Sequence, residues 1–181
     1  VVVRIAYVAG GKKPNTLGMN FETFILATML DTVADAATRR LQVMSKGRYS
    51  LRRTLDRKTA RSAGGLELEV FDMYTGRERS VTTLSGGEGF MASLSLALGL
   101  ADVVQAYAGG IHLDTMFIDE GFGALDPESL DLALDTLIDL QRDSGRLVGV
   151  ISHVPELEER IDARLEVSMT ETGSTTRFVV G

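Results

Sequence analysis

Cysteine is absent from the 181 residues, and histidine occurs only as His112 and His153. Without cysteine the chain forms no disulfide and offers no thiolate ligand to a metal ion. Two histidines are too few for a histidine-rich metal cage. Any metal ion bound here must therefore be a hard ion held by carboxylate oxygens.

We also expect no membrane-spanning segment in the sequence. We find no run of about 18 apolar residues that would span a bilayer. The opening residues 1–4 are too short and wrongly flanked for a signal peptide. We therefore expect no membrane partner and a cytoplasmic location. The first residue is Val1 rather than Met, which suggests a piece of a longer protein.

The composition fits one globular domain, or a large lobe of one, because 44% of the residues are hydrophobic and 24% are charged. The net charge of −6 hides an asymmetry, because the segment 114–162 is strongly acidic while the segment 39–61 is basic. Such a basic segment is suited to an anionic partner. Its basic residues are Arg39, Arg40, Lys46, Arg48, Arg52, Arg53, Arg57, Lys58 and Arg61.

The first half of the chain predicts one long helix and a small antiparallel sheet. Apolar residues recur at three- and four-residue intervals over 21–44, which indicates an amphipathic helix. The runs 49–55 and 66–71 predict antiparallel strands, with a turn at 74–77. Residues 1–19 start with a short apolar stretch and continue as a loop.

The second half has a different pattern. Strand-like runs at 115–118 and 147–151 are each followed by a segment with helical periodicity, which is typical of an α/β lobe with a part-parallel sheet. The last strands are predicted at 163–169 and 175–180, joined by a hairpin turn at 171–174.

A candidate anion site precedes the helical run 89–107. Ser85 and Glu88 have the spacing of a capping box, so a simple helix start accounts for part of the pattern. Gly86 and Gly87 are harder to explain, since glycine costs roughly 1 kcal/mol in a helix relative to alanine. They would make sense if a ligand approached the backbone, and a phosphate is the anion that best suits a helix N-terminus. Capping and phosphate binding both remain open here.

Acidic residues end the first buried strand. Asp119 and Glu120 are poor strand residues, so the pair marks either the start of a solvated loop or a site. Ligands of open α/β sheets bind at this edge. His153 ends the next strand, where a loop or capping role is the alternative to a functional one. Asp126 and Pro127 are explained locally as the cap and first position of a helix.

Taken in order, these motifs resemble the second half of an ATP-binding-cassette nucleotide-binding domain. The resemblance implies a signature motif that contacts ATP across a dimer interface, a Walker B end that holds Mg²⁺ through water and carries the general base, a D-loop aspartate and a switch histidine. The matching residues are Ser85, Gly86, Gly87 and Glu88, then Asp119 and Glu120, then Asp126, then His153.

Within that family the chain is most similar to SbcC, the ATPase subunit of the SbcCD nuclease. A glutamate follows the two glycines, the signature helix is long, and Glu120 is followed by Gly121 rather than proline. The stretches 48–49 and 74–77 extend the likeness, whereas Gly89 departs from it because the family often has a larger residue there.

A phosphate-binding loop is missing from the sequence. It needs Gly-x-x-x-x-Gly-Lys-Ser/Thr, and Gly11-Lys12 fails because Ala6 and Lys13 stand at the other required positions. The resemblance implies that this loop lies in an N-terminal lobe joined through coiled-coil arms. We therefore expect residues 1–19 to be a coiled-coil stub and residues 20–181 to be the C-terminal lobe of a P-loop ATPase head.

The function implied by the resemblance is ATP hydrolysis that gates a nuclease on DNA ends, in a nucleoid-associated complex. Its partners would be the N-terminal lobe, a second identical head, an SbcD-type nuclease subunit docked near the helix 21–44, and double-stranded DNA. The alternatives are another SMC-like ATPase that tethers chromosomes, or a non-catalytic DNA-binding adaptor. The candidate DNA contacts are Arg48, Arg52, Arg53, Arg57 and Lys58.

Overall fold

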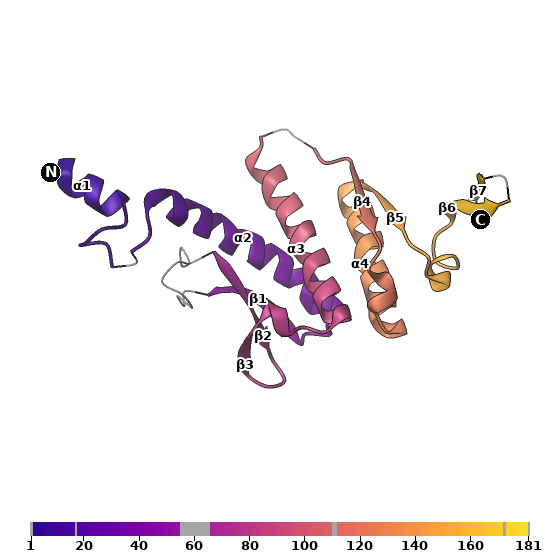
Figure 1. The fold of residues 1–181 in the computed structure, drawn as a ribbon, viewed down its shortest axis with the longest axis horizontal. Helices are drawn as coiled ribbons and strands as arrows, with labels where there is room; N and C mark the ends of the chain where they lie inside the picture. The colour runs from indigo at the N-terminus through magenta and orange to yellow at the C-terminus, as the bar shows by residue number, and fades with distance from the viewer. Residues whose placement is uncertain (1, 17, 55–65, 110–111, 172, 181) are drawn as a thin grey trace.

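A computed structural model describes residues 2–16, 18–54, 66–109, 112–171 and 173–180. Leu55, Arg57, Lys58 and Arg61 lie outside the described residues, so the predictions that fall on them stay predictions. The two ends of the chain lie at opposite ends of the molecule's long axis (Figure 1).

Two helices open the chain, α1 (Val2–Ala9) and α2 (Phe21–Met44). The bounds of α2 confirm the helix predicted over 21–44. Its first turn is capped by Asn20, whose side-chain oxygen accepts a hydrogen bond from the Thr23 N–H at 2.7 Å. The short helix α1 precedes the predicted loop, and its assignment to a coiled-coil stub stays a prediction.

An antiparallel sheet follows, in the order β1 (Tyr49–Thr54), β2 (Glu67–Asp72) and β3 (Arg77–Ser80). The first two strands confirm the prediction, whereas β3 was missed and begins at the last residue of the predicted turn. The sheet is fastened to α2 by Thr38, whose hydroxyl accepts the Leu51 N–H at 2.9 Å and donates to the Leu51 carbonyl at 3.2 Å.

After β3 the chain passes through η1 (Val81–Thr83) and reaches Ser85, which caps the long helix α3 (Gly86–Tyr107). This helix crosses α2 at close range (Figure 1). A Cβ at Gly99 would lie 2.7 Å from the Ala37 backbone nitrogen and 2.9 Å from the Val33 carbonyl oxygen, so only glycine allows this approach.

By length and hydropathy, α3 could also cross a membrane, which our expectation about apolar runs did not anticipate. Its apolar character has an internal explanation, because the helix packs against α2 and 44% of its most apolar 18-residue window is buried. The buried residues of α3 are Met91, Ala92, Leu94, Ser95, Leu98, Gly99, Ala101 and Val103.

A βαβ unit forms the second half, as predicted. Strand β4 (Thr115–Asp119) continues through η2 (Phe122–Ala124) into α4 (Pro127–Ser144), and β5 (Leu147–Ile151) returns parallel to β4. One face of this two-stranded sheet packs on the core. The other face is open, with Phe117 73% exposed, Leu147 62% and Ile151 53%.

The chain ends in η3 (Pro155–Leu157) and the hairpin of β6 (Ala163–Thr170) and β7 (Gly173–Val180). The predicted turn was too long, because Gly173 and Ser174 already belong to β7. The hairpin projects from the rest of the chain (Figure 1). In its register, one face carries exposed apolar side chains: Leu165, Val167, Met169, Phe178 and Val180.

The main core joins α2, α3, α4 and the β1–β3 sheet, and the partly buried side of β4 and β5 packs against it. Phe122 from η2 is its largest fully buried side chain. This core holds the predicted site loops in fixed positions relative to one another. Together these elements confirm an α/β lobe with a part-parallel sheet, flanking helices and additional antiparallel strands.

Candidate ATPase half-site

The carboxyl ends of β4 and β5 bring two predicted residues together. The parallel register pairs Asp119 with Ile151, and the Glu120 N–H donates to the Ile151 carbonyl at 2.9 Å. Beyond that bond, Nδ1 of His153 lies 3.0 Å from Oε2 and 3.2 Å from Oε1 of Glu120. Both side chains are exposed at the edge of the sheet. A carboxylate and an imidazole are therefore in direct contact where a ligand of such a sheet would bind.

The backbone at Glu120 is unusual. Its φ is +60°, and the next residue, Gly121, has a φ of +100°. A non-glycine residue with positive φ costs of order 1 kcal/mol and persists only where its surroundings impose it. The surroundings here include Phe90, because a Cβ on Gly121 would overlap its ring. The chain therefore turns sharply after Asp119 and directs Glu120 away from the strand.

The signature segment has the capping-box geometry that its spacing predicted. The Glu88 N–H donates to Ser85 Oγ at 3.3 Å, and the Ser85 N–H donates to Glu88 Oε2 at 2.9 Å. The serine oxygen accepts the bond from the Glu88 N–H with a lone pair, and its hydroxyl hydrogen can still donate to an external acceptor. An exposed donor at the N-terminus of α3 is suited to a phosphate oxygen.

The two signature glycines differ in their structural role. A Cβ at Gly87 would lie 2.7 Å from the Ala124 carbonyl oxygen, so this glycine is required by internal packing. A Cβ at Gly86 would lie 3.7 Å from Ala124 Cβ, an ordinary contact. Packing alone is therefore a sufficient reason for Gly87, and the close approach of a ligand to the two glycines stays a prediction. The absent side chain of Gly87 lets the signature helix rest on η2.

Asp126 caps α4, as its sequence position predicted. Its Oδ1 accepts the Ser129 N–H at 3.0 Å and its Oδ2 accepts the Ser129 hydroxyl at 2.6 Å. These bonds hold the pKa of Asp126 below its usual range. A cavity of about 570 Å³ lies between the signature, this cap and the start of β1. Its lining includes Ser85, Gly86, Gly87, Glu88, Asp126, Lys46, Arg48 and Tyr74.

Glu88 also has partners that the sequence did not reveal. The Tyr49 hydroxyl donates to Glu88 Oε1, and Arg79 Nη2 donates to Glu88 Oε2 at 3.2 Å. Burial and the neighbouring carboxylate raise the pKa of Tyr49 to about 12, so the tyrosine remains a donor. The pKa of Glu88 is lowered by the bonds from Tyr49, Ser85 and Arg79, which outweigh its burial. The site therefore holds Glu88 ionised.

The candidate DNA residues have different surroundings. Arg53 donates to both oxygens of Asp31, at 2.7 and 2.9 Å, and its side chain is mostly buried. Arg48 makes a paired contact with Asp72, at 3.3 and 3.1 Å, which lowers the pKa of that carboxyl. Arg52 is exposed, stacks on Phe71 and lies 3.6 Å from an exposed glutamate. Of these three arginines, Arg52 is the one most accessible to a phosphate backbone.

A divalent cation would need ligands beyond those that the chain brings together. In the described parts of the chain, no three carboxylate, histidine or cysteine side chains converge to hold a metal ion. Asp119 lies exposed at the end of β4, beside the Glu120–His153 pair. It can therefore contribute one carboxylate to a hard ion whose other ligands are water and phosphate oxygens, which is the binding mode that Mg²⁺ prefers.

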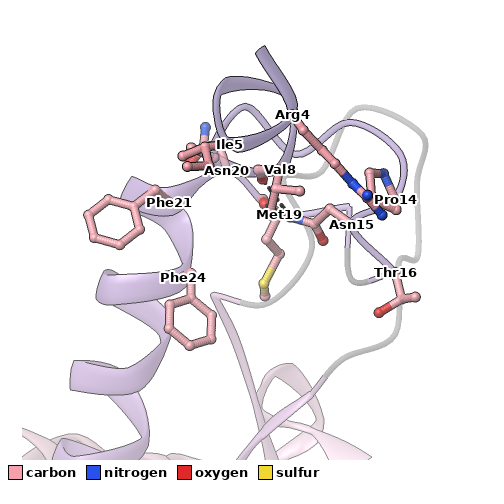
Figure 2. A pocket seen from close by; sticks show the side chains of 11 residues that line it. Arg4, Ile5, Val8, Pro14, Asn15, Thr16, Met19, Asn20, Phe21 and Phe24 are labelled. Atoms are coloured by element: carbon pink, nitrogen blue, oxygen red, sulfur yellow. Dashed lines mark hydrogen bonds between the residues drawn. The ribbon is translucent and has the colours of Figure 1, made fainter. Parts of the chain in front are cut away.

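A second cavity, of about 760 Å³, lies between α1, the following loop and the first turns of α2. Figure 2 shows its side chains converging from these three segments. Its walls include Ile5, Val8, Met19 and Phe24, with Arg4 and Asn15 among its polar members. Asn15 fixes the loop by donating to the Val8 carbonyl at 2.9 Å and the Met19 carbonyl at 2.8 Å. The groove is therefore mainly apolar, and α1, which forms one of its walls, lies away from β4 and β5 (Figure 1).

Comparison with known proteins finds similar sequences over nearly the whole chain. The family described as "SbcC/RAD50-like, Walker B motif" matches residues 53–139. The SbcC subunit of the SbcCD nuclease from Vibrio cholerae is 55% identical over 99% of this chain, and that from Staphylococcus aureus is 46% identical over 98%. The chain is similar to SbcC subunits over nearly its whole length. It spans 17% of the length of each of these curated relatives.

Solved structures agree on the fold of this chain. A chain from a study of ATP-driven dimerization and DNA-stimulated activation of SMC ATPases gives a TM-score of 0.67 at 17% identity, covering 87% of this chain and 89% of that one. The Smc head domain of Pyrococcus yayanosii gives 0.62 at 21% identity, covering 82% of this chain and 26% of that one. The fold is therefore that of SMC ATPase heads.

Proposed function

We infer that this chain is the C-terminal lobe of an ATP-hydrolysing head, which dimerises on ATP and gates a nuclease partner in the processing of DNA ends. The observation that carries this proposal is the Glu120–His153 contact at the shared end of two parallel strands. The identity of 55% to an SbcC subunit of the SbcCD nuclease favours the SbcC branch over chromosome-tethering SMC proteins, to which the likeness is 15–21% identity.

In this proposal the residues divide the work between two heads. Ser85 and the N–H groups of the first turn of α3 contact the γ-phosphate of a nucleotide held by the opposite head. Glu120 orients and polarises the attacking water, while His153 contacts the γ-phosphate. Asp119 holds Mg²⁺ through water, and the ion would supply charge stabilisation for phosphoryl transfer. Asp126 positions the interface at the start of α4.

The open faces of the chain support a head that is completed by another lobe. The exposed side of β4 and β5 and the apolar side of the β6–β7 hairpin are sheet surfaces that a soluble protein rarely leaves uncovered. An N-terminal lobe that brings the phosphate-binding loop would cover apolar sheet surface and complete the site. The residues up to 19 would then belong to the coiled-coil root.

Separate expression of the two lobes tests this division. The purified 181-residue chain should show no ATP turnover above background, because it contains no Gly-x-x-x-x-Gly-Lys-Ser/Thr loop. Adding the N-terminal lobe of the same protein should restore turnover. The control is an N-terminal lobe whose loop lysine is replaced by alanine, which should restore none. Turnover by the chain alone would contradict the proposal.

The remaining partners follow from the surfaces. The apolar groove between α1 and α2 is a suitable place for a helix of an SbcD-type nuclease subunit to dock. Double-stranded DNA would contact the basic sheet edge, where Arg52 is exposed. A cytoplasmic, nucleoid-associated location follows from this role.

DNA binding by the complete complex tests the role of Arg52. Charge reversal, Arg52→Glu, should reduce the slope of log affinity against log salt by about 1, because a phosphate contact is lost. Arg53 is unsuitable for this test, because its removal would leave Asp31 without its partner. The matched control is Arg142→Glu, an exposed arginine of α4 in the acidic half. An unchanged slope for the Arg52 variant would remove this contact from the proposal.

A further inference from the structure

A cluster beneath the signature motif joins α3 to the β1–β3 sheet. Arg79 of β3 has contacts in three directions: Nη1 donates to the Thr83 carbonyl at 3.2 Å, and Nη2 donates to Tyr49 Oη at 3.1 Å and to Glu88 Oε2 at 3.2 Å. Tyr49 of β1 donates to the other oxygen of Glu88. Both carboxylate oxygens of Glu88 are therefore held by the sheet.

The same glutamate also holds the signature serine. Glu88 Oε2, which accepts from Arg79, accepts the Ser85 N–H at 2.9 Å as well. Arg79 fixes the segment before Ser85 too, because its bond to Thr83 ties the end of η1 to β3. The position of Ser85 is thus set from both sides by one arginine.

The cluster is built to be rigid. Glu88 and Arg79 are only partly exposed, with side-chain exposures of 20% and 30%, and Tyr49 is buried. Arg48 stacks on the Tyr49 ring, 4.7 Å from its centroid, while its guanidinium is held by the buried Asp72. Charge-assisted hydrogen bonds among partly buried groups are stronger than exposed ion pairs.

We propose that Tyr49 and Arg79 are positioning residues for the signature serine, acting through Glu88 to hold Ser85 where it meets the nucleotide of the opposite head. This inference rests on the proposed function and adds residues to its site. The capping box alone would stabilise the first turn of α3. The link to β1 and β3 does something different, because it fixes where the helix start lies relative to the rest of the lobe.

A consequence is that the sheet and the trans-ATP contact are mechanically connected. The three strands are hydrogen-bonded in one sheet, so a partner that displaces β1 or β3 also displaces the donors to Glu88. The Glu88 carboxylate bonds both to the sheet and to the Ser85 N–H. A displacement of the sheet would therefore be passed on to Ser85. The exposed Arg52 lies on the same strand as Tyr49.

The test uses the full-length protein with Tyr49→Phe and Arg79→Gln. The ATP concentration that gives half-maximal head dimerisation should rise about tenfold in each variant, the factor that corresponds to loss of one charge-assisted hydrogen bond. ATP affinity of the monomeric head should stay within about twofold, because the phosphate-binding loop is not touched. Arg79→Lys should recover part of the loss, since it retains a donor to Glu88.

The matched control is Arg160→Gln, which removes a guanidinium that bridges two carboxylates, Asp131 and Asp135, away from the signature. It should leave the dimerisation threshold unchanged. Melting temperatures of all variants separate this effect from general destabilisation. If Tyr49→Phe and Arg79→Gln keep the wild-type threshold, or if Arg160→Gln raises it equally, the positioning role is wrong. ATP turnover by the wild-type protein reports independently on the proposed function.

Discussion

Replacing Glu120 by glutamine in the full-length protein should lower ATP turnover by at least about 100-fold, the lower range for losing a general base. The glutamine keeps the size of the side chain and can still accept a hydrogen bond from His153. Because Glu120 is exposed, the variant should fold normally. ATP binding should persist, so the variant should accumulate as an ATP-bound dimer. Steady-state turnover and size-exclusion chromatography with ATP measure both effects.

The control for this result is Glu156→Gln. Glu156 lies in η3, three residues after His153, and is exposed. Glu156 carries the same charge as Glu120 and follows the same end of β5. The glutamate that contacts the imidazole of His153, however, is Glu120. Loss of Glu156 should therefore leave turnover within about twofold of wild type. If Glu120→Gln hydrolysed ATP at the wild-type rate, the chain would instead fit a non-catalytic adaptor that retained the fold.

The sequence predicted the parts of the fold that local rules control. Helix α2 was predicted over its full length because its apolar spacing is regular. The capping box at Ser85 and the cap at Asp126 were predicted because the bonds involved span only three residues. The meeting of Glu120 and His153 was anticipated from one further rule, that parallel strands end at the same sheet edge.

Other features could not be predicted, because they are short or depend on contacts between distant parts of the chain. Helix α1 has only eight residues and none is buried, so its bounds within the expected coiled-coil stub could not be predicted. Strand β3 reads Arg-Glu-Arg-Ser, which has no apolar alternation, and is held by its pairing with β2. The bonds of Glu88 to Tyr49 and Arg79 join residues 39 and 9 positions apart, and no local pattern encodes them.

Gly87 has a packing role that its place in the motif did not predict. The spacing of the signature identified the segment, yet it could not show that the Ala124 carbonyl lies where a Cβ would be. Packing against η2 is thus a requirement at this glycine that the sequence could not reveal. Gly86 remains the position where a close approach by a ligand is the simpler explanation.

Phe122 carries the second large expected effect, on stability. Its side chain is fully buried in the main core, and its ring meets the Phe90 ring edge-on at a centroid distance of 4.9 Å. Replacing a buried phenylalanine by alanine costs about 3–5 kcal/mol through lost transfer energy and the cavity that remains. Phe122→Ala should lower the unfolding free energy of the 181-residue chain by that amount in urea denaturation, a large share of a typical stability of roughly 5–15 kcal/mol.

Two further variants make this prediction specific. Phe122→Leu retains most of the volume and should cost less than about 2 kcal/mol. Phe117→Ala removes the same ring from the open face of β4 and should cost less than about 1 kcal/mol in the chain alone, because that ring is 73% exposed. Equal losses for Phe117 and Phe122 would show that burial does not decide the effect.

Since Phe90 packs on both Gly121 and Phe122, the ring pair that stabilises the core also holds the backbone turn that directs Glu120. Stability and the geometry of the candidate base therefore depend on the same contact.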